Sequence, residues 1–430
     1  MFTWPPFAFA YERRKAADMS EFPSSARRYL VLAMLVAVYV LNFLDRQIVS
    51  ILAVPIKAEF HLSDAQMGSM GGLAFGAVYS LLGIPVAWLA DRISRKRIIA
   101  AALILWSGFT AACGFTQTFG QLFIARMGVG IGEAGGVAPS YSLISSVFPP
   151  RSRARALAVY SLGIPIGVAA GTLVGGLLAA DWRRAFVVVG LTGVVVAVPF
   201  LLLVREPHRA ESRAAVPGIA VVARMALTKP SFWLLSIAAG CSSLVGYGIL
   251  FWFPSFLVRT YHFTLPHVGQ FIATVTLFGG VIGILGGGIL ADRLGPARKG
   301  AYALIPAVAF LISAPLYALG MLAPSPEIAF WLFLVPQALS LMWLGPIVTA
   351  VQHLGPAVSR SQMSALVLLV NSLIGLGLGP WFFGKVSDLL KPEHGADSIK
   401  YAFLAGLSFY VVAAVLLIFA SRRLARDWVD

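Results

Sequence analysis

The sequence L-A-D-R-I-S-R-K at residues 89–96 recurs in similar form as L-A-D-R-L-G-P-A-R-K at residues 290–299. The two L-A-D-R copies lie 201 residues apart, and each connects one long apolar segment to the next. A match of four residues is weak evidence by itself, but its placement at corresponding points of the chain indicates an internal repeat. The chain is therefore predicted to consist of two similar halves.

The composition around these copies is typical of a membrane protein. Of the 430 residues, 59% are hydrophobic and 12% are charged, and the mean hydropathy is +0.84. Soluble domains carry about 25% charged residues, so a single soluble domain and a disordered chain are excluded. The net charge of +15 comes from basic clusters between apolar runs, which favours membrane topology over nucleic-acid binding.

Twelve apolar segments are long enough to cross a bilayer, which takes about 20 residues. They lie at about residues 28–57, 66–90, 98–117, 121–148, 155–179, 184–204, 231–258, 266–290, 300–322, 327–353, 362–390 and 400–421. We expect an all-α membrane protein whose twelve transmembrane helices form two pseudo-symmetric six-helix bundles. The predicted divisions are a leader with a candidate interfacial helix, an N-terminal bundle, a central linker, a C-terminal bundle and a tail, at residues 1–28, 29–204, 205–230, 231–421 and 422–430.

Basic residues are distributed unevenly between the two sides of this predicted topology. If residue 1 is cytoplasmic, the inner segments hold 24 Lys and Arg residues and the outer connections hold five. This bias follows the positive-inside rule. We therefore expect a multi-pass integral membrane protein with the leader, the linker and the tail in the cytoplasm.

Four charged residues lie deep within predicted helices of the first half: Asp45, Arg46, Arg126 and Glu133. A charge at the bilayer centre costs roughly 3 kcal/mol on insertion scales, so such residues are expected to face a cavity, pair with each other or carry function. Carboxylates can take up a proton whereas Arg keeps its charge. This predicts Asp45 and Glu133 as proton-coupling residues and Arg46 and Arg126 as a charge network for a substrate headgroup. The alternative is a static network that specifies helix packing.

The second half has few buried charges and many large apolar residues, so a cavity between the halves is predicted to have one charged wall and one apolar wall. Such a cavity suits a substrate with an anionic head and an apolar tail. The candidate lining residues are Tyr247, Phe251, Thr274, Phe278, Trp343 and Asn371. The alternative for each aromatic residue is a position in the packed core or facing lipid.

The two L-A-D-R loops supply candidates for a cytoplasmic gate. An Asp at a helix end and Arg residues in the next turn can bridge neighbouring helix termini and separate when that side opens. The candidates are Asp91, Arg92, Arg95, Asp292 and Arg293. The alternative is that these residues only anchor the topology and contact anionic lipid headgroups.

Two halves with a D-R-x-[GS]-x-(x)-[RK] loop after the second helix of each resemble the major facilitator superfamily. Further strings resemble the Spinster-like transporters of that superfamily: N-F-L-D-R at 42–46, R-M-G-V-G-I-G-E-A at 126–134, P-S-Y at 139–141, Y-S-L-G-I-P-I-G at 160–167 and D-W-R-R-A-F at 181–186. This resemblance implies a carrier of sphingosine-1-phosphate-like lipids or lysophospholipids, often proton-linked, with Asp45 and Glu133 as the protonatable pair beside Arg46 and Arg126. The short loops and basic bias resemble bacterial members, so the expected location is a bacterial inner membrane.

The leading hypothesis is therefore a secondary active transporter of an amphipathic anionic lipid that works by alternating access with protons as the coupling ion. The runner-up is a proton-coupled transporter of a small organic anion or drug on the same fold. An enzyme and an ATP-driven pump are not expected, because neither a P-loop nor an H-E-x-x-H motif occurs in the sequence. We expect no cofactor, no metal and no nucleic-acid partner, and a monomer in the membrane.

Overall fold

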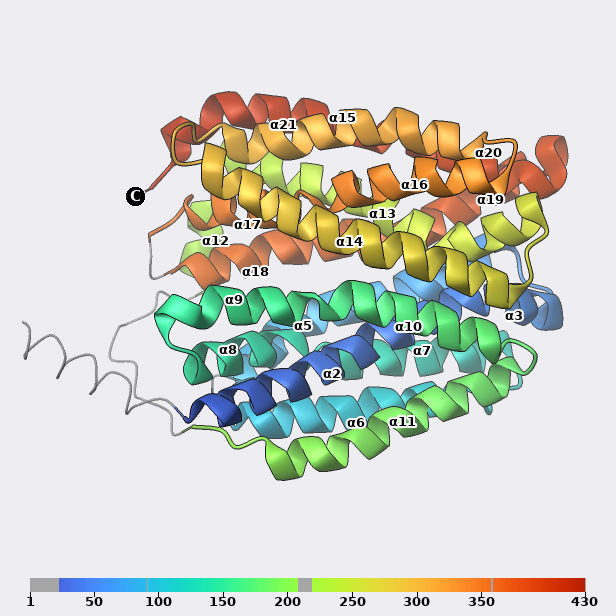
Figure 1. Ribbon diagram of the computed structural model, residues 1–430, viewed down its shortest axis with the longest axis horizontal. Coiled ribbons are helices and arrows are strands. Elements are labelled where there is room, and N and C mark those ends of the chain that lie inside the picture. Colours follow the sequence, from blue (N-terminus) through green and yellow to red (C-terminus); the bar gives the residue numbers. More distant parts are fainter. Residues whose placement is uncertain (1–22, 91, 208–218, 357–358, 430) are drawn as a thin grey trace, which may run out of the picture.

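The structure is a computed structural model that describes residues 23–90, 92–207, 219–356 and 359–429. All its regular elements within these ranges are helices, which confirms the predicted all-α architecture. Figure 1 shows the helices running side by side along the longest axis, with the first half of the chain below the second half.

In the first half, most predicted spans consist of two or three helical pieces. The helices are α2 (Ser25–Ile51), α3 (Ala53–Phe60), α4 (Asp64–Ser69), η1 (Met70–Ala77), α5 (Val78–Ala90), α6 (Arg95–Cys113), α7 (Phe119–Glu133), α8 (Val137–Val147), α9 (Pro150–Ser161), α10 (Gly163–Leu177) and α11 (Trp182–Leu203). Polar side chains fix several helix starts: the carboxylate of Asp181, for example, accepts the Arg184 N–H at 3.0 Å and caps α11.

The second half repeats this arrangement after a short helix in the linker. Its helices are α12 (Ile219–Leu227), α13 (Pro230–Tyr261), α14 (Leu265–Leu294), α15 (Ala301–Met321), α16 (Pro326–Leu341), α17 (Leu344–Gln352), α18 (Arg360–Asn371), η3 (Ser372–Leu378), α19 (Gly379–His394), η4 (Gly395–Asp397), α20 (Ser398–Gly406) and α21 (Ser408–Asp427). Helix α12 lies within the predicted linker, where it packs on α13 and α18.

Nine helices in the described part of the chain are long and apolar enough to cross a membrane. The last of them, Gln362–Asp427, is 66 residues long and covers two of the predicted spans. The predicted spans at 66–90 and 121–148 are also helical but are not among the nine. The prediction of twelve spans is thus matched in part.

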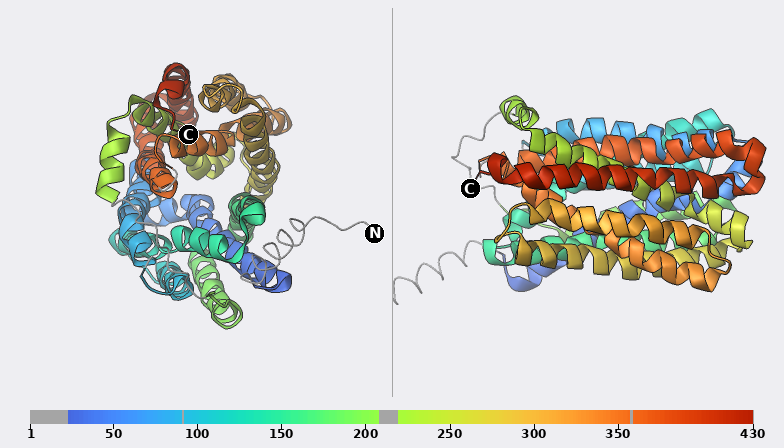
Figure 2. Two further views of the ribbon diagram at one scale, coloured as in Figure 1. Left: turned by 90° about the vertical axis from the view of Figure 1, so that its left-hand side faces the viewer. Right: turned by 90° about the horizontal axis from the view of Figure 1, so that it is seen from above.

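Two sets of helix contacts join the halves along their length. Helix α10 packs along α14, and α4 and η1 pack along α19 and η3. Figure 2 (left), which looks along the bundle from the end with the C-terminus, shows the two halves as two clusters of helices. The central contact between them is therefore lined by helices of both halves.

The elements η1 and η3 are π-helical segments that lie against each other across this contact. Their sequences, M-G-G-L-A-F-G-A and S-L-I-G-L-G-L, are rich in glycine. A Cβ atom on Gly72 would lie 2.6 Å from the Gly377 carbonyl oxygen, and one on Gly76 would lie 2.8 Å from the Gly377 Cα. Glycine is therefore required for this close approach of two backbones.

Candidate functional site

Arg46 of α2 and Glu133 of α7 form an ion pair between two helices of the first half. The Arg46 Nε donates to the Glu133 Oε2 at 2.7 Å. The Glu133 side chain is fully buried and that of Arg46 is 12% exposed. Two of the four buried charges predicted from the sequence thus meet directly.

Asp45 points to a different neighbour, as expected for adjacent residues about 100° apart on a helix. Its carboxylate Oδ2 accepts a hydrogen bond from the Thr110 hydroxyl of α6, and the residue is buried. Asp45 therefore faces a helix neighbour within the first half, while Arg46 faces the contact between the halves.

Aromatic rings surround the Arg46 guanidinium. Its Cζ lies 4.6 Å from the Tyr79 ring centroid, 4.9 Å from that of Phe75 and 5.1 Å from that of Phe43. The Cζ of Arg126 lies 5.4 Å from the same Phe75 ring, so Phe75 contacts both guanidinium groups. Cations are attracted to aromatic ring faces at such distances.

A small pocket, which we call the central pocket, lies beside these groups between the halves and has a volume of about 40 Å³. Helices of both halves line it. The lining residues are Phe43, Arg46, Gln47, Ser50, Gly71, Phe75, Arg126, Val168, Tyr247, Leu250, Phe251, Leu376 and Pro380. The structure thus brings four predicted residues to one cavity: Arg46, Arg126, Tyr247 and Phe251.

Several buried donors in this pocket make no hydrogen bond to any described residue. They are the Nη2 of Arg46, the Nε and Nη1 of Arg126 and the Nε2 of Gln47. Buried polar groups are normally hydrogen-bonded, and a guanidinium fork matches the oxygens of a phosphate or carboxylate. The pocket can therefore receive an anionic group.

Four predicted lining residues lie elsewhere. Phe278 is 58% exposed on α14, and Thr274, one turn earlier, donates its hydroxyl to the Gln270 carbonyl. Asn371 is buried and accepts a hydrogen bond from the Ser243 hydroxyl at 2.6 Å. Trp343 is buried in a hydrophobic core to which both halves contribute.

The gate candidates that the structure describes lie near the ends of α5 and α14 and at the start of α6, at the end of the bundle where the C-terminus lies (Figure 1). Asp91 is outside the described residues, Arg92 is exposed, and Asp292 and Arg293 are exposed at the end of α14. Arg95 is buried: its Nε lies 3.1 Å from the Glu206 Oε1 and its Nη1 donates to the Ser142 carbonyl at 2.9 Å. Arg95 thus joins the start of α6 to the start of the linker.

Sequence reasoning missed a buried polar cluster at the opposite end of the bundle. Asp64, at the start of α4, accepts two hydrogen bonds from Arg259 of α13, at 2.7 and 3.0 Å. The Ser387 hydroxyl of α19 donates to the same carboxylate at 2.7 Å, and Lys57 pairs with it too. The backbone N–H of Asp64 donates to the carboxylate of Asp388, also on α19, at 2.9 Å. We call Lys57, Asp64, Arg259, Ser387 and Asp388 the distal cluster.

The distal cluster joins both halves, because Lys57 and Asp64 belong to the first half and the other three to the second. Asp64 lies before the predicted span 66–90.

Burial opposes the ionisation of Asp64, but the hydrogen bonds and charges of Arg259 and Lys57 outweigh this effect and hold the pKa of Asp64 well below its usual value. In the sequence, S-D-A-Q at 63–66 is typical of a helix start, and nothing in it indicates a partner almost 200 residues away.

Another motif from the sequence, D-W-R-R-A-F at 181–186, has a structural role. The Trp182 indole and the Arg183 guanidinium both donate to Glu59 in the last turn of α3, at 2.6 and 2.7 Å. Arg183 also donates to the Thr116 carbonyl at 2.9 Å. The motif therefore fastens three helix ends of the first half together.

Comparison with known proteins identifies relatives over most of the chain. The family model of the Major Facilitator Superfamily matches residues 35–380. An MFS-type efflux pump of Mycolicibacterium smegmatis is 34% identical over 422 residues, covering 96% of this chain and 97% of that protein. Human protein spinster homolog 1 is 27% identical over 395 residues, covering 86% of this chain and 74% of that protein.

Two crystal structures of a bacterial homolog of the human lysosomal transporter Spinster have the same fold. The inward-facing, unoccupied form superposes with a TM-score of 0.86 at 31% identity, covering 95% of this chain and all of that one. The inward-facing, occupied form gives a TM-score of 0.82 with the same coverage.

Proposed function

Because the chain belongs to the Major Facilitator Superfamily and is homologous to the Spinster proteins, we propose that it moves an amphipathic anionic lipid across a membrane by alternating access. The lipid class is that of sphingosine-1-phosphate or a lysophospholipid, and protons are the coupling ion. The protein then acts as a monomer in a bacterial inner membrane, with both termini in the cytoplasm.

The observation that carries this proposal is the set of free guanidinium donors in the central pocket. Arg46 and Arg126 line a cavity between the halves, and both have buried N–H groups that lack a hydrogen-bond partner among the described residues. A phosphate head bound there would satisfy them with charge-assisted hydrogen bonds. Tyr247 and Phe251, on the other half, would contact the part of the substrate next to the head.

Proton coupling follows from the ion pair between Arg46 and Glu133. While Glu133 is ionised it holds the Arg46 Nε. A proton on Glu133 removes the negative charge and releases Arg46 to bind the anionic head. Substrate and proton then enter the site together. Asp45, beside Arg46 in the sequence, is the second candidate for protonation in this scheme.

The size of the pocket supports alternating access. A cavity of about 40 Å³ is far smaller than a typical ligand pocket of about 300–1,000 Å³. A lipid can enter only if the halves move apart on one side. The gate candidates Asp91, Arg92, Arg95, Asp292 and Arg293 would act at the cytoplasmic side and the distal cluster at the other.

A second candidate cargo is a small organic anion or drug on the same fold. The observation that favours it is the 34% identity to an MFS-type efflux pump over nearly the whole of both chains. The same two guanidinium groups would bind a carboxylate. The two candidate substrates share an anionic group but differ in the rest of the molecule, which is a long apolar tail in the lipid and a small organic group in the other.

The test is transport in proteoliposomes that contain the full chain. Labelled sphingosine-1-phosphate, a lysophospholipid and a small aromatic carboxylate are offered separately, with and without an imposed pH gradient. We expect gradient-dependent movement of a lipid, and a loss of at least tenfold in the Arg126→Gln variant. If only the carboxylate moves, the small organic anion is the favoured cargo. If none of the three compounds moves, both proposed cargoes are wrong.

A further inference from the structure

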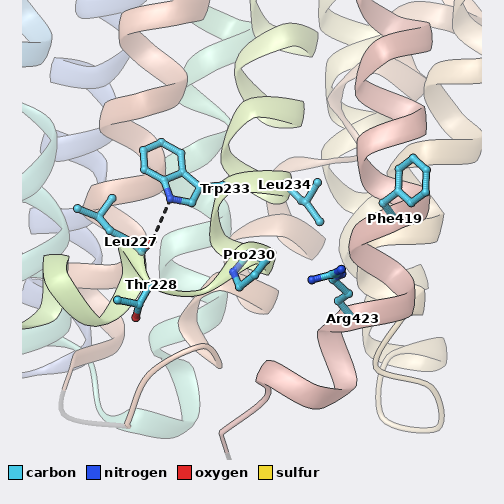
Figure 3. A pocket seen from close by; sticks show the side chains of 7 residues that line it. All are labelled: Leu227, Thr228, Pro230, Trp233, Leu234, Phe419 and Arg423. Atoms are coloured by element: carbon cyan, nitrogen blue, oxygen red, sulfur yellow. Dashed lines mark hydrogen bonds between the residues drawn. The ribbon is translucent and has the colours of Figure 1, made fainter.

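A groove on the outer surface of the second half has no part in the transport scheme. It lies at the end of the bundle near the C-terminus, between the end of α12, the start of α13 and the end of α21 (Figure 3). Its lining residues are Leu227, Thr228, Pro230, Trp233, Leu234, Phe419 and Arg423. The central pocket shares none of these residues.

One wall of the groove is apolar and belongs to membrane-spanning helices. Trp233 is 41% exposed near the start of α13, and Phe419 is 52% exposed near the end of α21. Exposed side chains on membrane spans face lipid, and aromatic side chains are enriched where the hydrocarbon meets the headgroups. The Trp233 indole donates to the Leu227 carbonyl at 3.0 Å, which fixes the ring against the end of α12.

The other wall carries a cation that lacks a protein partner. Arg423 is exposed and forms no hydrogen bond or ion pair with another residue of the described chain. The nearest acid along its helix, Asp427, accepts the Ser231 N–H at 3.2 Å and, through its carbonyl, the Lys229 ammonium at 2.8 Å. Figure 3 shows the Arg423 guanidinium turned from α21 toward Pro230, across the groove.

We propose that this groove binds one anionic phospholipid of the surrounding bilayer. The phosphate lies on the Arg423 guanidinium, whose fork of N–H donors matches phosphate oxygens. One acyl chain runs along Trp233, Leu234 and Phe419. The positive charge of Arg423, which forms no ion pair with an acidic residue of the described chain, favours an anionic over a zwitterionic headgroup.

The position of the groove suggests a regulatory role for the lipid. Helix α12 is part of the linker between the halves and contributes Leu227 to the groove. A bound phospholipid would bridge α12, α13 and α21 and hold the linker helix on the second half. Anionic lipid would therefore stabilise the fold without entering the transport pathway.

The experiment measures lipid binding rather than transport, so its outcome is independent of the proposed cargo. The purified full chain is titrated with phosphatidylglycerol or phosphatidylcholine of identical acyl chains, and bound lipid is counted by native mass spectrometry. We expect one phosphatidylglycerol to bind about tenfold more tightly than phosphatidylcholine. Arg423→Gln should abolish this preference, whereas the matched neighbour Arg422→Gln, whose side chain does not line the groove, should retain it.

Three results would overturn the proposal. They are equal binding of the two lipids, an equal loss of preference in the two Arg variants, and an unchanged preference in Arg423→Gln. A second measurement on the unaltered chain keeps the test independent of folding. A photoreactive phosphatidylglycerol should crosslink to the segments 227–234 and 419–423, and crosslinks confined to other segments would also contradict the proposal.

Discussion

Two adjacent residues of α2 divide the electrostatics of the central site between them. Asp45 is held inside the first half by Thr110, whereas Arg46 reaches Glu133 and the pocket. An adjacent Asp and Arg on a helix cannot point in the same direction, so the sequence was sufficient to predict this split. It was not sufficient to predict which helix each side chain meets.

The pair of Arg46 and Glu133 leads to a prediction about coupling. Glu133→Gln removes the carboxylate that we propose takes up the proton, but it leaves the shape of the side chain nearly unchanged. We expect pH-driven accumulation of substrate to fall at least tenfold while counterflow exchange without a gradient continues. Both are measured in proteoliposomes, with Glu327→Gln as a control because Glu327 is exposed at the start of α16. Accumulation that survives in Glu133→Gln would contradict the coupling role.

Phe75 offers a second test at this scale, because its ring contacts the guanidinium groups of both Arg46 and Arg126. Phe75→Leu keeps an apolar side chain but loses the ring face. A cation–π contact contributes about 0.5–2 kcal/mol, so we expect the KM for the anionic substrate to rise by about two- to thirtyfold. Phe200→Leu, also fully buried but without such a cation contact, should lower thermal stability and leave KM unchanged. An equal KM in the two variants would contradict this role.

The π-helical segments η1 and η3 show how elements set the position of the pocket. Each supplies residues to it: Gly71 and Phe75 come from η1, and Leu376 comes from η3. π-helical turns often occur at functional sites. Because glycines allow the two segments to touch, the pocket lies directly beside the contact between the halves.

A matched pair of glycine variants tests this contact. In Gly76→Ala, the new Cβ would lie 2.8 Å from the Gly377 backbone, whereas at Gly83, in the neighbouring α5, nothing lies within 4 Å. Overpacking of this kind typically costs about 1–3 kcal/mol. We expect a lower Tm and slower transport for Gly76→Ala and values close to those of the unaltered chain for Gly83→Ala. Equal Tm values for the two variants would contradict the assignment.

At the scale of elements, the sequence predicted the spans more reliably than the contacts between them. Apolar run length located the helices, but it did not predict the π-helical turns, because glycine-rich runs are equally compatible with straight helices. The cavity predictions show the same limit: Tyr247 and Phe251 line the pocket, whereas Phe278 is exposed on α14. A helix that is apolar all round carries no periodicity that separates a cavity face from a lipid face.

For the whole molecule, alternating access requires contacts between the halves that can break on one side at a time. The distal cluster provides them at one end, with Asp64 bound to Arg259 and Ser387 across the interface. The charge of Asp64 hardly depends on pH in the physiological range. The pKa of Asp64 is lowered in the folded protein, so its stabilising effect is complete above the unfolded value of about 3.9. That effect is lost only as the pH falls below this value toward the folded pKa.

The distal cluster should therefore control opening at its end, whereas the proposed proton coupling assigns the pH dependence of transport to Asp45 and Glu133. In Asp64→Asn, Arg259 and Lys57 lose their charged partner, and breaking a buried pair costs about 3–5 kcal/mol. We place spin labels at Gln117 and Glu393, both exposed at this end, in a background that lacks Cys113 and Cys241. Measured by double electron–electron resonance, the two labels should move apart in the Asp64→Asn variant.

In the unaltered chain the distance between the labels should be the same at pH 5.5 and 7.5. A distance that is unchanged in Asp64→Asn, or that increases at pH 5.5 in the unaltered chain, would show that the cluster does not close this end in the way argued. Asp388→Asn, which keeps one acceptor oxygen for the Asp64 N–H but removes the charge and the acceptor of the Ala65 N–H, should give a smaller change than Asp64→Asn.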